Sequence, residues 1–304
     1  MLEKTDFAGW RNCIKLKNSN IELIITTDVG PRIISCGFIK GQNLLYVSSK
    51  DKGKTCGDTW RIYGGHRLWH SPEAMPRTYF PDNTAVDFKW NGKTLKLLQN
   101  VENNTGIIKE MEITLESNCN KIKILHRIIN KNLWDIELSP WAITACAAGG
   151  RAILPQEPYI DPADFMLPAR PLALWYYTRM DDPRWVWGNK YIQLKHDHSI
   201  ISEQKIGIMN KQGWAAFYFQ GDIMIKRFDF DRQAKYPDYG CNNEIYVNGN
   251  LLEIESLGPL TKIAPDGAVE HTEYWMLAQL TGDFMGENEK SIDKHLIPLV
   301  NSFT

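Results

Sequence analysis

The chain has 304 residues and carries 35 basic and 36 acidic side chains, which gives a formal net charge of -1 at pH 7. This balance lacks the basic surplus of proteins that bind nucleic acid or anionic membranes, so neither partner is expected. Hydrophobic residues make up 43% of the chain, enough for a sizeable core, but no stretch of about 18 apolar residues predicts a membrane span.

Short segments in which apolar and polar residues alternate run through most of the chain, broken by Gly, Asn, Asp and Pro. Residues 86–90, the Asn91-Gly92 pair and residues 94–98 predict a β-hairpin. The other predicted strands are 21–25, 33–38, 107–115, 122–129, 191–194, 214–220, 223–228, 244–247, 251–257 and 271–280. Roughly fifteen strands at such spacing predict an all-β sandwich or barrel. We expect one domain over residues 1–304.

Two segments depart from this strand pattern. Residues 287–303 predict a single C-terminal helix, because Ile292, Leu296 and Val300 recur at helical spacing and acidic residues come first. We expect this helix to pack on the outside of a sheet. Residues 155–171 contain five prolines and predict an irregular loop over one face of the domain.

Residues 64–73, with the sequence GGHRLWHSPE, are the richest in chemistry. Charged and hydrogen-bonding side chains next to an indole suit a ligand with hydroxyl groups and C–H faces, which describes a sugar. The two glycines would let backbone and ligand approach closely. We therefore expect a sugar site that includes Arg61, Arg67, Trp69, His70, Asp82 and Asn83. The alternative is a structured surface loop with a stacked tryptophan.

A second group of candidate residues lies near the C-terminus. Glu253 and Glu255 are two apart in a predicted strand and share a face, and Glu244 lies in the strand before the Asn248-Gly249 turn. The flanking residues are apolar, so burial would raise the carboxyl pKa towards the range of a general base. The alternative is a solvated sheet face.

The spacing of His66, His70 and Glu73 would place three metal ligands on one face if the segment were a helix. Gly64-Gly65 and Pro72 argue against a helix there, so we expect neither a metal nor another cofactor. Among the remaining histidines, His126 is expected to be packed in a strand.

Six cysteines are scattered without a CxxC pair, and the first eleven residues contain no apolar signal-peptide region. These features favour a reducing compartment, the cytoplasm, although a chain trimmed of a leader would look the same. The sequence does not indicate an oligomeric state.

Three stretches resemble the galactose mutarotase-like (aldose 1-epimerase-like) superfamily. They are residues 30–34 (GPRII) followed by 43–46 (NLLY), residues 64–69 (GGHRLW), and residues 243–267 with the final strand. The resemblance implies a large antiparallel β-supersandwich with a sugar-binding cleft on its concave face. It also implies an acid–base reaction that opens and recloses a sugar ring at the anomeric carbon.

The same resemblance suggests roles for particular residues. Glu255 takes the position of the family's catalytic base, with Glu244 nearby as a sugar-binding residue. The family's acid histidine corresponds to Trp141, so His66 is expected to be the acid in preference to His70. Trp69 and Trp141 are expected to offer a ring face to the ligand, although both could instead be core residues. A non-catalytic sugar-binding or sensing protein on the same fold is the alternative function.

Overall fold

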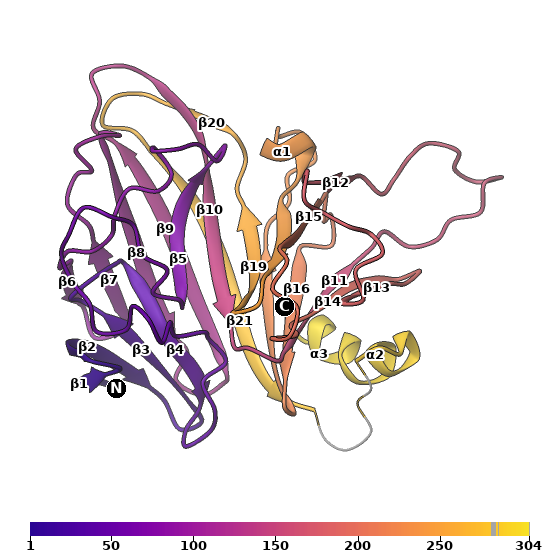
Figure 1. Ribbon diagram of the computed structural model, residues 1–304, viewed down its shortest axis with the longest axis horizontal. Coiled ribbons are helices and arrows are strands. Elements are labelled where there is room, and N and C mark those ends of the chain that lie inside the picture. The colour runs from indigo at the N-terminus through magenta and orange to yellow at the C-terminus, as the bar shows by residue number, and fades with distance from the viewer. Residues whose placement is uncertain (281–283, 285, 304) are drawn as a thin grey trace.

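The computed structural model describes residues 1–280, 284 and 286–303. The described residues form two large antiparallel sheets with few helices (Figure 1). In spatial order, the first sheet consists of β1 (Leu2–Phe7), β2 (Trp10–Lys17), β3 (Ile21–Thr26), β4 (Arg32–Phe38), β5 (His66–Ser71), β10 (Ile136–Cys146), β19 (Leu252–Leu257), β18 (Asn243–Val247), β15 (Gln204–Ile208) and β12 (Leu172–Leu174), with β20 (Thr261–Ile263) on β10.

The second sheet lies against the first. In spatial order it consists of β13 (Trp185–Trp187), β14 (Tyr191–Lys195), β11 (Arg151–Pro155), β16 (Trp214–Phe219), β17 (Asp222–Phe228), β21 (Ala268–Gln279), β9 (Lys121–Asn130), β8 (Ile107–Leu115), β7 (Thr94–Leu98) and β6 (Asp87–Trp90). The main hydrophobic core lies between the sheets and includes Leu23 and Ile254 from the first and Phe217 and Trp275 from the second. The predicted all-β sandwich is therefore confirmed.

The main difference from the predicted strands is β5, because no strand is predicted for residues 66–71, which were expected to form part of a sugar site. It lies near the middle of the first sheet, between β4 and β10, and all six of its residues are buried. Gly64 and Gly65, which precede it, have positive φ angles of 95° and 67°. A Cβ atom on Gly65 would lie 2.2 Å from the carbonyl oxygen of Ile33, so this glycine allows two backbone segments to meet.

The C-terminal segment forms two short helices instead of the single predicted one. These are α2 (Glu289–His295) and α3 (Ile297–Asn301). Pro298 explains the break, because it has no N–H to donate and its ring clashes with the carbonyl four residues earlier. Ile292, Leu296 and Val300 pack on the outer face of the second sheet, against residues such as Ile225, as expected.

The proline-rich segment 156–171 contains no helix or strand, as predicted, but it extends away from the sheets instead of lying over one face (Figure 1). The remaining helix, α1 (Pro237–Gly240), is a single turn in which Asp238 and Tyr239 have positive φ. In the described part of the chain, no helix is long and apolar enough to cross a membrane.

Candidate functional site

A cavity of about 440 Å³ opens on the first sheet, and we call it the cleft. Its floor is formed by side chains of β5, β10, β19 and β15 that alternate with the residues facing the core. Eight of its lining residues are aromatic: Tyr46, Trp60, Trp69, Tyr79, Trp141, Trp175, Tyr177 and Tyr246. Four are glutamates and two are cations: Glu73, Glu203, Glu253, Glu255, Arg67 and Lys205.

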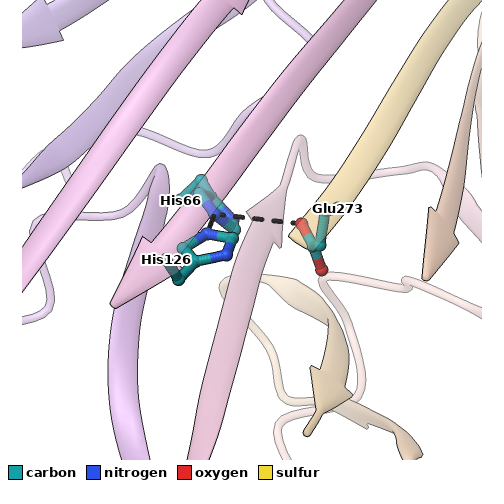
Figure 2. A group of neighbouring side chains, drawn as sticks. All are labelled: His66, His126 and Glu273. Atoms are coloured by element: carbon teal, nitrogen blue, oxygen red, sulfur yellow. Dashed lines mark hydrogen bonds and ion pairs between the residues drawn. The ribbon is translucent and has the colours of Figure 1, made fainter. Parts of the chain in front are cut away.

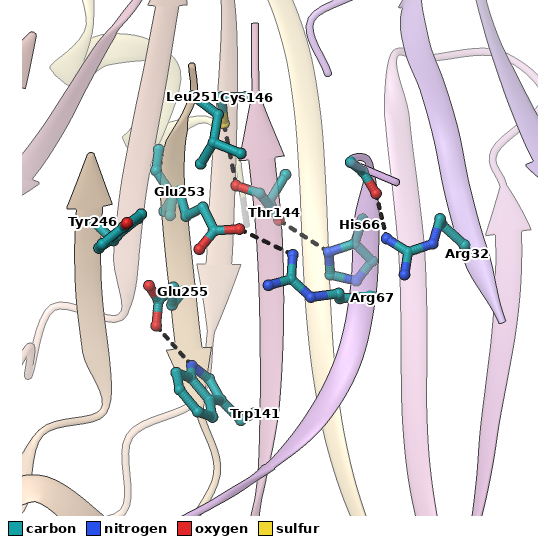
Figure 3. Close-up of polar contacts among 12 residues, drawn as sticks. Arg32, His66, Arg67, Trp141, Thr144, Cys146, Tyr246, Leu251, Glu253 and Glu255 are labelled. Atoms are coloured by element: carbon teal, nitrogen blue, oxygen red, sulfur yellow. Dashed lines mark hydrogen bonds and ion pairs between the residues drawn. The ribbon is translucent and has the colours of Figure 1, made fainter. Parts of the chain in front are cut away.

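The strand register explains why residues distant in sequence meet in the cleft. Arg67 pairs with Ile143, Ile143 with Glu255, and Glu255 with Glu244, across four neighbouring strands. Directly paired residues point to the same face of a sheet, so this row places a cation and two carboxylates on one surface. Glu253, two residues before Glu255, lies on the same face (Figure 3).

Lys205 is the central cation of the cleft. Its Nζ lies 3.0 Å from Oε2 of Glu255 and 2.8 Å from Oε2 of Glu244. The same ammonium lies 4.6 Å from the ring centroid of Trp141 and 4.8 Å from that of Trp175. Two indoles and two carboxylates therefore surround one positive charge, an arrangement that strongly favours its charged form.

The pKa values of these groups are shifted in a consistent way. Burial raises the pKa of Glu255, with a further contribution from Glu253, and this outweighs the opposing effects of Lys205 and of the Trp141 indole. Burial likewise raises the pKa of Glu244 well above its usual value. Burial acts against the charged form of Lys205, but its two carboxylate partners raise its pKa well above the usual value.

Glu255 has one constrained and one available carboxylate oxygen. Oε2 accepts a hydrogen bond from the indole Nε1 of Trp141 at 2.8 Å (Figure 3). The same oxygen accepts a hydrogen bond from Lys205 at 3.0 Å. Oε1 has no hydrogen-bond partner among the described residues. Glu255 is therefore held in place through one oxygen and can accept a ligand proton through the other.

Arg67 is arranged in the same way on the other side of the cleft. Its Nη1 donates to Oε1 of Glu253 at 2.9 Å, and its guanidinium lies 4.6 Å from the ring centroid of Trp69. Arg67 is only 3% exposed, and its Nε has no partner among the described residues. A buried donor without an acceptor is costly, so this nitrogen is a point of strain in the cleft wall.

The structure brings four of the ten proposed site residues into the cleft lining: Arg67, Trp69, Trp141 and Glu255. A fifth, Glu244, is fully buried and touches the cleft through Lys205. Each of the two tryptophans already makes a cation–π contact within the protein, Trp69 with Arg67 and Trp141 with Lys205.

Arg61, Asp82 and Asn83 lie outside the cleft lining and have partners within the protein. Arg61 donates to the carbonyl of Cys56 at 2.5 Å. Asp82 pairs with the buried Arg32, and Asn83 fixes the neighbouring loop through the carbonyl of Thr59. These contacts indicate that the three residues hold the segment before β5 in place.

His66 and His70 are also absent from the cleft lining, because they occupy the face of β5 that points into the protein. Residues of alternating parity on a strand point to opposite faces, so Arg67 and Trp69 face the cleft while His66 and His70 do not. His66 is 0% exposed and contacts Trp275 of the second sheet. The expected placement of His66 and His70 beside the ligand therefore differs from the structure.

His66 belongs to a chain of hydrogen bonds that crosses between the sheets. Nδ1 of His126 lies 2.9 Å from the carbonyl oxygen of His271, which can only accept, so this nitrogen carries the hydrogen. Nε2 of a neutral His126 then accepts from Nε2 of His66 at 2.7 Å. Nδ1 of His66 in turn accepts from Thr144, which accepts from Lys226. One carbonyl thus fixes the direction of the whole chain.

His66, His126 and Glu273 are the group that could hold a metal ion, since their ligand atoms lie within 4.8 Å of one another (Figure 2). However, the two imidazoles already share a hydrogen bond, and Lys226 supplies a positive charge 2.9 Å from Glu273. Burial lowers the pKa of His66 well below its usual value, which keeps the imidazole neutral. The protein's own groups therefore satisfy this cluster.

Several cleft residues were not singled out from the sequence. Lys205 lies in a strand whose alternate residues are apolar, and a lone lysine on a strand usually faces solvent. Trp175 and Tyr177 follow the short strand β12, which comes after the proline-rich segment and is not among the predicted strands. Glu253, by contrast, is singled out by its spacing of two from Glu255.

The fold is that of galactose mutarotase-like proteins. A galactose mutarotase-like protein from Lactobacillus casei superimposes with a TM-score of 0.59 at 10% identity, over 88% of this chain and 100% of that one. A putative aldose 1-epimerase from Escherichia coli gives a TM-score of 0.51 at 12% identity, over 88% and 99%. A galactose mutarotase-like protein from Clostridium acetobutylicum gives 0.54 at 11% identity, over 92% and 99%. No protein-family model and no curated protein matches the sequence.

Proposed function

We propose that the cleft binds an aldose and interconverts its anomers by acid–base catalysis. The observation that carries this proposal is the pair Glu253 and Glu255, two carboxylates on one face of β19 that both line a cavity walled by aromatic rings. Aromatic rings bury the C–H faces of sugars, while the charged groups bind hydroxyls. The solved structures with this fold include proteins described as mutarotases and aldose 1-epimerases.

Ring opening requires a base for the anomeric hydroxyl and an acid for the ring oxygen. Both oxygens are bonded to the same carbon, so two neighbouring carboxyl groups can serve them. In the proposed step one of the two carboxyl groups, that of Glu253, is protonated, and that of Glu255 is ionised. Glu255 takes the hydroxyl proton through its free Oε1, and Glu253 gives its proton to the ring oxygen. Rotation about the C1–C2 bond and the reverse transfers then produce the other anomer.

The surrounding cations have supporting roles in this scheme. Arg67, 2.9 Å from Glu253, stabilises the carboxylate that remains after its proton is given. Lys205 and Trp141 hold Oε2 of Glu255, which leaves Oε1 directed to the ligand. The buried histidines take no part, because none lines the cleft in the described part of the chain.

A non-catalytic sugar-binding protein is the second candidate, and a specific observation favours it. Each of the two carboxylates is already paired with a cation, Glu253 with Arg67 and Glu255 with Lys205. Such pairs favour the ionised carboxylates and would reduce the proton available to the ring oxygen.

NMR exchange spectroscopy distinguishes these functions. Exchange between α and β anomers is measured for a panel of aldoses, with the protein and with a variant carrying both Glu253→Gln and Glu255→Gln. We expect faster exchange with the wild-type protein for at least one aldose and only the uncatalysed rate with the double variant. Saturable binding of an aldose without faster exchange would refute the catalytic proposal and support the binding protein.

A further inference from the structure

The cleft contains more carboxylates than cations, and this excess affects the charge of the ligands that it can bind. Among the described lining residues four are carboxylates and two are cations. Both cations are already neutralised, since Arg67 pairs with Glu253 and Lys205 contacts both Glu255 and Glu244. An anionic ligand such as a sugar phosphate would therefore meet no free positive charge and several negative ones.

Two of the carboxylates, Glu73 and Glu203, have no cation of their own in the described part of the chain. Glu73 accepts a hydrogen bond from the hydroxyl of Tyr79, and Glu203 accepts one from Tyr246 at 2.9 Å. Both glutamates lie at the exposed rim of the cleft. Each keeps lone pairs that a ligand donor can use.

Both rim carboxylates act on the same group of the cleft, the hydroxyl of Tyr177. Burial raises the pKa of Tyr177, and Glu255, Glu73 and Glu203 raise it further against the opposing effect of Lys205. A single hydroxyl thus lies within the electrostatic reach of three carboxylates. A ligand group at that end of the cleft would interact with the same carboxylates, since the charge of Lys205 is already paired with Glu255 and Glu244.

The protein itself shows what this environment binds. The Lys205 ammonium is held by two carboxylates and lies over two indole rings, those of Trp141 and Trp175. Aromatic faces combined with carboxylates are the usual surroundings of a bound ammonium group. The rim also combines carboxylates with aromatic residues, Glu73 with Tyr79 and Glu203 with Tyr246, but these glutamates have no cation among the described residues.

We propose that the sugar bound in the cleft carries a positively charged amino group, which lies at the rim between Glu73 and Glu203. This inference rests on the proposed sugar-binding function and adds the class of substrate, an amino sugar with a free ammonium group.

The test compares ligands that differ in a single group. Isothermal titration calorimetry at pH 6 measures the affinities of an aldohexose, its 2-amino-2-deoxy form, its N-acetylated amino form and its 6-phosphate, in the gluco, galacto and manno series. We expect the free amino sugar of at least one series to bind about tenfold more tightly than its parent, the effect of one charge-assisted hydrogen bond. N-acetylation should remove this advantage, and the phosphate should bind most weakly.

Matched variants locate the effect. Glu73→Gln and Glu203→Gln should each reduce the ratio of the affinity for the amino sugar to that for its neutral parent. Glu270→Gln, an exposed change on β21 outside the cleft, should alter neither. No amino-sugar preference in any series, a preference that survives in the double variant Glu73→Gln/Glu203→Gln, or a phosphate that binds best would overturn the inference.

The two proposals can fail separately. If the amino sugar binds preferentially but its anomers exchange only at the uncatalysed rate, the ligand class stands and the catalytic function fails. If neutral and amino sugars are bound and interconverted equally well, the catalytic function stands and the ligand class fails.

Discussion

His66 and Arg67 are neighbours in the sequence but point to opposite faces of β5. Arg67 lines the cleft and pairs with Glu253, whereas His66 is fully buried between the sheets and pairs with His126. Adjacent positions on one strand therefore lie in separate surroundings, Arg67 at the cleft and His66 in the interior between the sheets. This separation can be tested with one substitution at each position.

His66→Ala should destabilise the protein and leave sugar affinity intact in the molecules that remain folded. It removes the partner of Thr144 and of His126 and creates a small cavity, so we expect a loss of about 2–4 kcal/mol in the free energy of unfolding. Urea denaturation measures the loss. Arg67→Gln should instead weaken sugar binding at least about tenfold. A stable His66→Ala protein that no longer interconverts anomers would show that His66 takes part in the reaction.

Glu255→Gln should lower the turnover of anomer exchange by about 10²–10⁴, the usual contribution of a general base. The amide has nearly the same shape and can still accept from Trp141, so folding should be preserved. Glu270→Gln on the exposed side of β21 serves as the control. Unchanged exchange in Glu255→Gln would remove this residue from the mechanism.

Trp141→Phe should shift the acidic limb of the pH–rate profile to higher pH. The indole Nε1 donates to Glu255 at 2.8 Å and helps to hold its pKa down against burial. Phenylalanine keeps an aromatic ring but has no donor, so the protonated carboxyl becomes more favourable. Trp69→Phe, which loses no bond to Glu255, should leave the limb in place. A Trp141→Phe profile that coincides with the wild-type profile would contradict the assigned hydrogen bond.

His70 should make the protein sensitive to mild acid. Burial lowers its pKa from 6.5 to about 3, so below pH 6.5 the unfolded chain binds a proton that the folded protein does not. Stability is therefore complete above this pH and is lost as the pH falls towards 3. Between pH 7 and pH 5 the wild type should lose about 2 kcal/mol more than His70→Leu. Urea denaturation at both pH values measures the difference, and equal losses would contradict it.

Part of the fold was predictable because strands such as β7, β8 and β9 alternate between buried and less buried residues. Residues 94–98 and 107–115 were predicted with the boundaries that β7 and β8 have in the structure. Strand β5 was missed for a physical reason. It is buried on both faces, so polar and aromatic residues occur at both parities and no alternation is visible.

The candidate site was only partly predictable, because its ion pairs join residues of different strands. Glu255 was identified through its resemblance to a family position, but the sequence offers no sign that Lys205 is its partner, 50 residues away. The burial of His66 could not be predicted because its partners, Thr144 and His126, are supplied by other strands. Which face a strand residue occupies depends on pairing, which local sequence does not encode.

The ion pair between Arg67 and Glu253 joins residues that are 186 positions apart in the chain. Contacts of such long range form only after a large loss of chain entropy, and the cleft needs both β5 and β19 in one sheet. A nascent chain that has not yet emerged as far as β19 therefore has no binding site. A ligand that binds in the cleft would consequently report that synthesis has passed β19.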